Sequence, residues 1–196
     1  SIMSVIALFL SVMGFLVRFY TVGTTPFGTS GRNTKEQVAE QLNTTGIYSL
    51  VRHPLYLGNY LIWLGLVVFT GSVWYIVVFS LMYWLYYERI MLAEEQFLFE
   101  KFGSTFLSWT NSVPAFLPRF SGFTPPGAPL SFKQILRREY SGILSTVIGF
   151  VFVDILRTYF TKQVITIGQP YLIALIVMTV ITVVLRSLKH YTKVLG

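Results

Sequence analysis

Two groups of ionisable residues in this sequence could do chemistry, and both lie next to apolar runs. The first is the pair Arg52-His53, which precedes Pro54 in the stretch Gly46 to Tyr60, GIYSLVRHPLYLGNY. Proline is tolerated in the first turn of a helix, where its missing N–H has no partner, so we expect a helix to begin at about Pro54. The free N–H groups and partial positive charge of a helix start favour carboxylates and phosphates. The stretch could therefore bind an anionic group, although Arg52 and His53 could also serve only as anchors at a membrane surface.

The second group comprises Arg89, Glu94 and Glu95, in the sequence ERIMLAEEQF. Ionisable groups at a membrane edge are costly, which makes them candidates for function. On a helix, Arg89 and Glu94 are separated by about 140°. Since Glu94 and Glu95 are adjacent, we expect at most one of them to point inward. The alternative is a helix that leaves the bilayer with solvated charges.

Composition identifies the class of protein. Of the 196 residues, 54% are hydrophobic and only 12% are charged, whereas a soluble domain has about 25% charged residues. We therefore predict an all-α, polytopic integral membrane protein. The absence of cysteine excludes disulfides and thiolate chemistry, and two histidines argue against a metal centre. The basic residues flank apolar segments, so the net charge of +7 favours an anionic membrane, lipid or cofactor over nucleic acid.

About five membrane spans are expected from the apolar runs. The first is slightly short for the ~20 residues that a span needs; it lacks a basic leader and a small-residue cleavage site, so we interpret it as a membrane helix and not a signal peptide. The turn at residues 70–72 should join the second and third spans into an antiparallel hairpin, residues 55–92. The runs are residues 2–17, 55–69, 73–92, 140–160 and 171–185.

The remaining segments are polar or amphipathic. We expect a short surface helix over residues 34–42, and an amphipathic helix over residues 93–103 with Gly103 as its C-cap. Two prolines should keep residues 113–118 extended. The predicted organisation is a core at residues 1–120, a linker and basic amphipathic segment at 121–139, and a C-terminal membrane hairpin at 140–196. Within that hairpin, Asp154 should pair with Arg157.

Orientation follows from the placement of lysine and arginine. All of the 15 Lys and Arg residues except Arg157 and Lys162 fall on the side that carries Arg52. We therefore predict that this side faces the cytoplasm, and we expect the membrane to be a bacterial inner membrane.

Several separated motifs occur together in one order. The stretch GIYSLVRHPLYLGNY is followed by a hairpin, then by R-x4-E-E-x-x-L-x3-F-G, then by V-P-x-F-x-P. Over about residues 32–118 the chain resembles the isoprenylcysteine carboxyl methyltransferase family and its bacterial phospholipid-methyltransferase-like relatives. The resemblance implies an S-adenosylmethionine-dependent enzyme with a cytoplasmic-side cofactor pocket over the hairpin, and a lipid or prenylated acceptor that enters from the bilayer.

The same resemblance implies roles for individual residues. Arg89 is similar to the arginine that binds the acceptor, although the family usually places it four residues before the glutamate and here the interval is five. Glu95 or His53 could remove a proton if the acceptor is an amine. The implied cofactor contacts are Asn33, Glu40, Gln41, Leu42, Asn43, Tyr48, His53, Pro54, Tyr56 and Glu94.

The residues fit this chemistry, and two other classes stay open. Methyl transfer from a sulfonium to an anionic acceptor needs alignment and desolvation more than a base, and one arginine can hold the anion. Carboxylates and tyrosines attract a cationic cofactor. The alternatives are an NADPH-dependent sterol-type membrane reductase, for which the basic cluster is sparse, and a non-enzymatic transporter or assembly protein, which only Asp154 favours.

Overall fold

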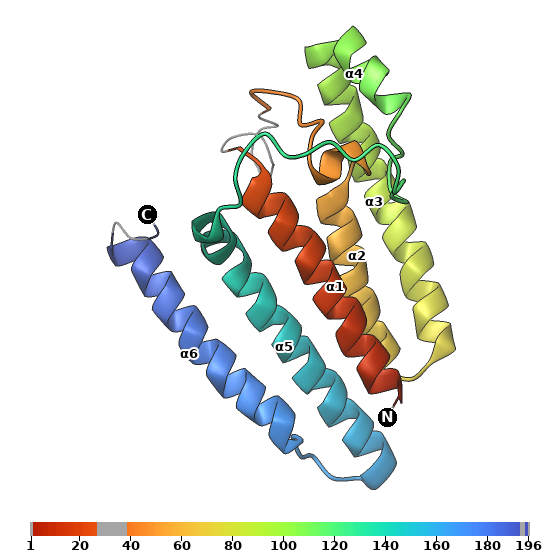
Figure 1. Cartoon of the computed structure of the whole chain (residues 1–196). Coiled ribbons are helices and arrows are strands. Elements are labelled where there is room, and N and C mark those ends of the chain that lie inside the picture. Colours follow the sequence, from red (N-terminus) through yellow and green to blue (C-terminus); the bar gives the residue numbers. More distant parts are fainter. Residues whose placement is uncertain (1, 27–38, 193–194, 196) are drawn as a thin grey trace. The chain divides into compact units, whose positions relative to one another are not determined.

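The structure is a computed structural model, and it describes residues 2–26, 39–192 and 195. In this part of the chain every named element is a helix (Figure 1), which confirms the all-α prediction. Gly46 and Thr124 form an isolated β-bridge. The elements are α1 (Ile2–Thr24), η1 (Ile47–Ser49), α2 (Pro54–Phe69), α3 (Val73–Phe102), α4 (Ser104–Thr110), α5 (Phe132–Lys162) and α6 (Gln169–Tyr191).

Four of these helices, α1, α3, α5 and α6, are long and apolar enough to cross a membrane. The apolar α2 has 16 residues, which corresponds to a length of about 24 Å. A hydrocarbon core of about 30 Å is longer than that. The polytopic membrane architecture is thus confirmed, and α2 is the one expected span that falls short.

Three helices, α1, α5 and α6, are longer than the apolar runs suggested. The first continues past residue 17 to Thr24, since Arg18 is buried and its Nη1 donates to Asn59 Oδ1 at 2.6 Å. The hydroxyls of Thr21 and Thr24 bond back to carbonyls one turn earlier. The basic run 132–138 forms the first turns of α5. Residues 39–42 are not helical, so a helix reaching residue 42 is wrong there; residues 34–38 lie outside the described part.

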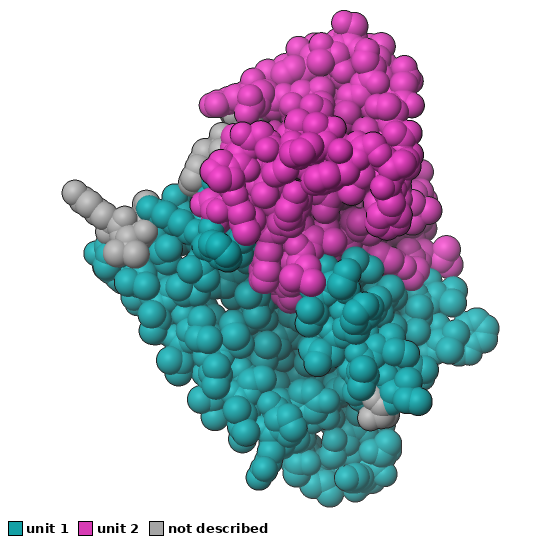
Figure 2. All heavy atoms as spheres, in the orientation of Figure 1, with its two compact units in different colours: residues 1–13, 61–77, 132–196 teal, residues 14–60, 78–131 magenta. Residues whose placement is uncertain are grey.

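The chain divides into two compact units (Figure 2). Unit 1 comprises Ser1–Met13, Leu61–Val77 and Phe132–Gly196. Its core centres on Phe69, whose ring contacts those of Phe150 and Tyr171 at 5.2 and 5.6 Å between centroids. At Gly65, an added Cβ would lie 2.5 Å from the carbonyl oxygen of Ala7, so α1 and α2 approach closely here only because this residue is glycine.

The α5–α6 hairpin in unit 1 corrects one expectation. Asp154 does not form the predicted ion pair with Arg157 among the described residues. Its Oδ2 instead accepts a hydrogen bond from the Gly168 amide at 2.9 Å. The Arg157 guanidinium lies over the Phe69 ring, 4.7 Å from the centroid. Asp154 therefore fixes the start of α6, and Arg157 is satisfied by an aromatic face.

Unit 2 comprises Gly14–Tyr60 and Val78–Ser131. The long α3 ends at Phe102 as predicted, and Gly103 has a positive φ of 51°. The short α4 that follows was not predicted. It buries Phe106 and Trp109, which pack with Val113 into a small apolar core. This core supports the segment that precedes α2.

Candidate active site at the start of α2

The segment before α2 is a tight turn. Gly46, with a positive φ of 60°, precedes the single 3₁₀ turn of η1. Pro54 is the first residue of α2, as predicted, and its side chain is fully buried. The carbonyl of His53 accepts the first helical bond, from the Leu57 amide at 3.1 Å. Arg52 and His53 are therefore held directly before a helix start.

A distant part of the chain holds this turn in place. We call residues 113–124 the strap. The amides of Arg52 and His53 donate to the carbonyls of Pro114 (2.9 Å) and Ala115 (3.1 Å), and the Arg119 amide donates back to Leu50 (2.9 Å). The strap is thus the backbone partner of a turn that has no sheet or helix to pair with.

Further bonds fix the two ends of this pairing. The Gly46 amide donates to the carbonyl of Thr124 at 2.8 Å, and the Thr124 amide donates to Ser49 Oγ at 3.0 Å. The Trp109 indole N–H donates to the carbonyl of Tyr48 at 3.1 Å. The extended conformation expected for residues 113–118 accordingly serves to present carbonyls to the turn.

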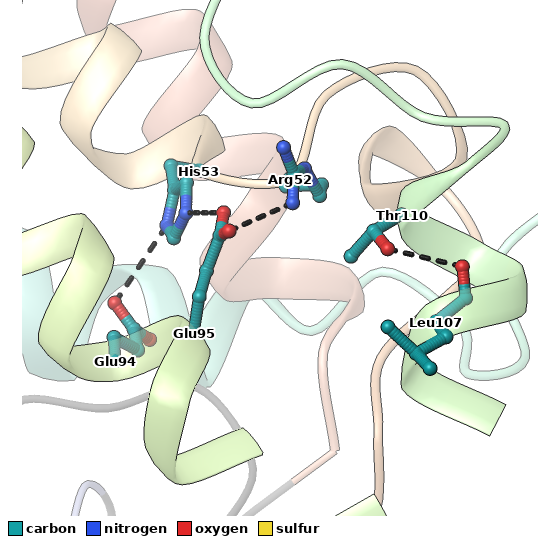
Figure 3. Close-up of polar contacts among 6 residues, drawn as sticks. All are labelled: Arg52, His53, Glu94, Glu95, Leu107 and Thr110. Atoms are coloured by element: carbon teal, nitrogen blue, oxygen red, sulfur yellow. Dashed lines mark hydrogen bonds and ion pairs between the residues drawn. The ribbon is translucent and has the colours of Figure 1, made fainter. Parts of the chain in front are cut away.

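Glu95 is the main ionic partner of the turn (Figure 3). Its Oε2 lies 2.8 Å from Arg52 Nη1, and its Oε1 lies 2.7 Å from His53 Nε2. An ionised carboxylate can only accept, so the His53 Nε2–H is the donor. The Arg52 and Glu95 side chains are 16% and 20% exposed, and that of His53 is 4% exposed. These bonds are shielded enough from water to hold the turn against α3.

Glu94 faces the same turn from its other side. Its Oε2 accepts a hydrogen bond from the Tyr56 hydroxyl at 2.9 Å and lies 3.7 Å from His53 Nδ1. The expectation that only one of the two glutamates points inward is wrong. The imidazole of His53 lies between the two carboxylates, one on each ring nitrogen (Figure 3), so two adjacent positions on α3 can both contact it.

Tyrosine rings line α2 and α3 beside this cluster. His53 stacks on Tyr56, with 5.5 Å between centroids, and Tyr56 contacts Tyr87 at 5.2 Å. Tyr87 stacks in turn on Tyr83 at 4.0 Å, and the Tyr83 hydroxyl donates to the carbonyl of Tyr56 at 2.7 Å. Two carboxylates and several electron-rich rings therefore converge at the start of α2. The Arg52 guanidinium balances the charge of Glu95, so Glu94 and the rings are the groups that favour a cation.

Some of the predicted site residues lie in the cluster at the start of α2, some lie in the apolar core around Phe106, and others lie in neither. His53, Pro54, Tyr56, Glu94 and Glu95 come together as described. Leu42 and Tyr48 pack instead against the apolar core around Phe106. Glu40 and Gln41 are exposed, and Asn43 is half-buried. Asn33 lies outside the described residues.

Arg89 is apart from this cluster. Its side chain is exposed on α3, and among the described residues it makes no hydrogen bond or ion pair. Arg52 differs, because its Nε is buried and has no acceptor in the part of the chain that the structure describes. A buried N–H without an acceptor is costly.

Three contributors to the site were not predicted: Arg52 as the ionic partner of Glu95, Tyr87, and Trp109. A signal existed for the first, in the motif Arg-His-Pro, and for the second, which is one helical turn after Tyr83. Nothing in the sequence paired Trp109 with a carbonyl 61 residues earlier. In the described residues, no group of three or more His, Asp and Glu side chains could hold a metal ion.

Residues 2–105, more than half of the chain, match the family model described as phospholipid methyltransferase. The chain belongs to the phospholipid methyltransferase family. The match includes α1–α3 and therefore both glutamates and the Arg-His-Pro turn. Most of α4 and all of the strap, α5 and α6 lie beyond it. The family resemblance noted from the motifs is confirmed.

Curated relatives of this phospholipid methyltransferase family member include a protein-S-isoprenylcysteine O-methyltransferase of Schizosaccharomyces pombe, 29% identical over 55% of this chain and 48% of the relative. The nickel-cobalt-cadmium resistance protein of Alcaligenes xylosoxydans is 36% identical over 48% of this chain and 41% of its own length. The cobalt-zinc-cadmium resistance protein of Cupriavidus metallidurans is 41% identical over 41% of this chain and 37% of its own length. The chain spans about half or less of the length of these relatives. No solved structure matches it significantly.

Proposed function

We propose that this protein transfers a methyl group from S-adenosylmethionine to a lipid or prenylated acceptor in the membrane. The observation that carries the proposal is the arrangement of His53 between Glu94 and Glu95 at the start of α2, inside the region that matches a methyltransferase family. Relatives named as methyltransferases of isoprenylcysteine support it. The proposal places the reaction in the predicted core, residues 1–120.

The residues present fit a cationic cofactor. Glu94 is 37% exposed, so one side of its carboxylate remains open after it accepts from Tyr56. The rings of His53, Tyr56 and Tyr87 offer electron-rich faces beside it. The buried Arg52 Nε–H could donate to a carboxylate oxygen of the same molecule. When bound, the cofactor would supply an electrophilic methyl group on sulfur.

The part played by the protein depends on the acceptor. A carboxylate or phosphate is already a nucleophile, so Arg89 would only have to hold and orient it. An amine must first lose a proton. We propose that Glu95 or His53 accepts that proton. On Glu95, the transfer would turn the carboxylate into a neutral acid and weaken its bonds to Arg52 and His53.

We also propose which side of the membrane the site faces and which membrane it is. Glu94, Glu95 and Arg52 lie on the side rich in Lys and Arg, so the site would face the cytoplasm, in a bacterial inner membrane. A cysteine introduced at exposed Glu100 should then react with an impermeant maleimide in inverted vesicles and not in intact cells. The opposite labelling pattern would place the site outside.

Calorimetric titration of the detergent-solubilised protein with S-adenosylhomocysteine, and separately with NADPH, tests the cofactor. We expect micromolar binding of S-adenosylhomocysteine, weakened about tenfold or more in Glu94→Gln by loss of a charge. Glu88→Gln is the matched control on the same helix, since Glu88 is exposed. Binding of NADPH alone would establish a reductase, and binding of neither would leave a non-enzymatic protein.

A further inference from the structure

The strap carries large apolar side chains that are exposed in the described part of the chain. Leu117 is 76% exposed, Phe120 is 86% exposed and Phe123 is 51% exposed. They occur within seven residues, beside Arg119, and form an apolar edge on a segment without regular secondary structure. Exposed apolar surface gathered in this way is typical of a surface that contacts another phase or molecule.

Backbone hydrogen bonds anchor the strap on both sides of these three side chains. Its amide and carbonyl groups at Pro114, Ala115, Arg119 and Thr124 are committed to the turn before α2. Those bonds fix which side of the strap faces the site. The exposure of Leu117, Phe120 and Phe123 is therefore a property of the folded unit and not of a loose loop.

Phe116 shows where the strap lies along α3. The ring of Phe116 packs edge-on against Trp84 and Tyr60, with 5.8 Å between centroids in each case. Trp84 is itself 46% exposed, on the apolar part of the candidate membrane span α3. Leu117 directly follows Phe116, so the exposed apolar residues of the strap adjoin the exposed apolar surface of α3 at Trp84.

From this placement we propose that the strap is a membrane-docking segment, whose Leu117, Phe120 and Phe123 enter the boundary between headgroups and hydrocarbon of the bilayer. Aromatic side chains favour that boundary, and Arg119 beside them suits the anionic headgroups. The bilayer would thereby hold the strap and, through its hydrogen bonds, the turn that carries Arg52 and His53. This inference does not depend on the reaction that the site catalyses.

The absence of cysteine makes the test direct. Single-cysteine variants Leu117→Cys, Phe120→Cys and Phe123→Cys would carry a nitroxide label in vesicles of phosphatidylethanolamine and phosphatidylglycerol. Power saturation would compare the access of oxygen, which partitions into lipid, with that of a water-soluble nickel chelate. Leu85→Cys, at an exposed position of α3, is the lipid control, and Glu100→Cys is the aqueous control.

We expect all three strap labels to favour oxygen over the nickel chelate by at least threefold, as at position 85. Nickel access at positions 120 and 123 equal to that at position 100 would overturn the proposal. So would protection from both reagents together with spin–spin broadening that disappears on dilution with unlabelled protein, since a second copy would then cover the strap. Each label faces away from the packed core, and unchanged thermal unfolding would verify that the variants fold.

Discussion

His53 Nε2 lies 2.7 Å from Glu95 Oε1, which joins the residue before α2 to one 42 positions later on α3. The other carboxylate oxygen of Glu95 accepts from Arg52. Glu95 therefore holds two consecutive residues of the turn, whereas the Glu94 side chain is 37% exposed. The two adjacent glutamates are in this way suited to different tasks.

Replacing Glu95 with glutamine should destabilise the protein. An amide offers a single acceptor oxygen, so either Arg52 or His53 would face an N–H group. We expect a loss of about 1–3 kcal/mol, the usual range for a hydrogen bond to a charged group that is partly buried. Thermal unfolding in detergent, followed by circular dichroism, would measure it. An unfolding midpoint equal to that of Glu88→Gln would show that the contact contributes nothing.

Removal of the Tyr56 hydroxyl should affect ligand affinity more than folding. Tyr56→Phe retains the ring that stacks on His53 but leaves Glu94 without its neutral donor. We expect the affinity for S-adenosylhomocysteine to fall about two- to tenfold, equivalent to one hydrogen bond. Calorimetry would measure this, with Tyr75→Phe as a control at an exposed tyrosine of α3. An increase in affinity would mean that the hydroxyl competes with the ligand for Glu94.

Arg89 is exposed, so its substitution should leave the fold unchanged and report on the acceptor alone. In Arg89→Lys the planar, bidentate donor is lost. We expect the KM for the acceptor to rise about 10- to 100-fold, and the affinity for S-adenosylhomocysteine to stay within twofold. Steady-state kinetics with a radiolabelled methyl donor would separate the two. Equal losses in both constants would assign Arg89 a structural role.

The close approach of α1 and α2 at Gly65 predicts a clear effect on stability. In Gly65→Ala the new methyl group would collide with the Ala7 carbonyl and with Ser11 Oγ, and the helices would have to separate. We expect a destabilisation of about 1–3 kcal/mol. Gly127→Ala is the control, because a Cβ there meets nothing within 4 Å. If both variants unfold at the same temperature, the helices are less closely packed than the structure indicates.

Local rules were sufficient for much of the helical framework. The start of α2 followed from Pro54, whose ring fixes φ and removes the N–H, and the end of α3 from Gly103, which adopts a positive φ without a Cβ clash. Hydropathy located the apolar helices, since burial in lipid requires a long apolar run. It did not locate the end of α1, since the partner that lets Arg18 stay inside the helix, Asn59, is distant in the sequence.

Only part of the candidate cluster could be predicted from motifs, and its arrangement could not. Motifs named His53, Tyr56, Glu94 and Glu95, and the structure brings them together. Helix geometry alone suggested one inward-facing glutamate, but an imidazole has two nitrogens and can contact both. The ion pair expected between Asp154 and Arg157 was wrong because helix spacing considers only side chains on the same helix. Asp154 instead accepts from the backbone amide of Gly168, at the start of α6.

The pairing of the turn with the strap also sets an order of events during synthesis. The indole of Trp109 and the amide of Thr124 reach back 61 and 75 residues to close the turn. While the ribosome is still making residues 54–102, the Arg-His-Pro segment has no backbone partner, although its helices can already enter the membrane. The turn can therefore be completed only after about residue 124 has emerged, so a nascent chain that stops after α3 would lack the hydrogen-bond partners of the Arg-His-Pro segment.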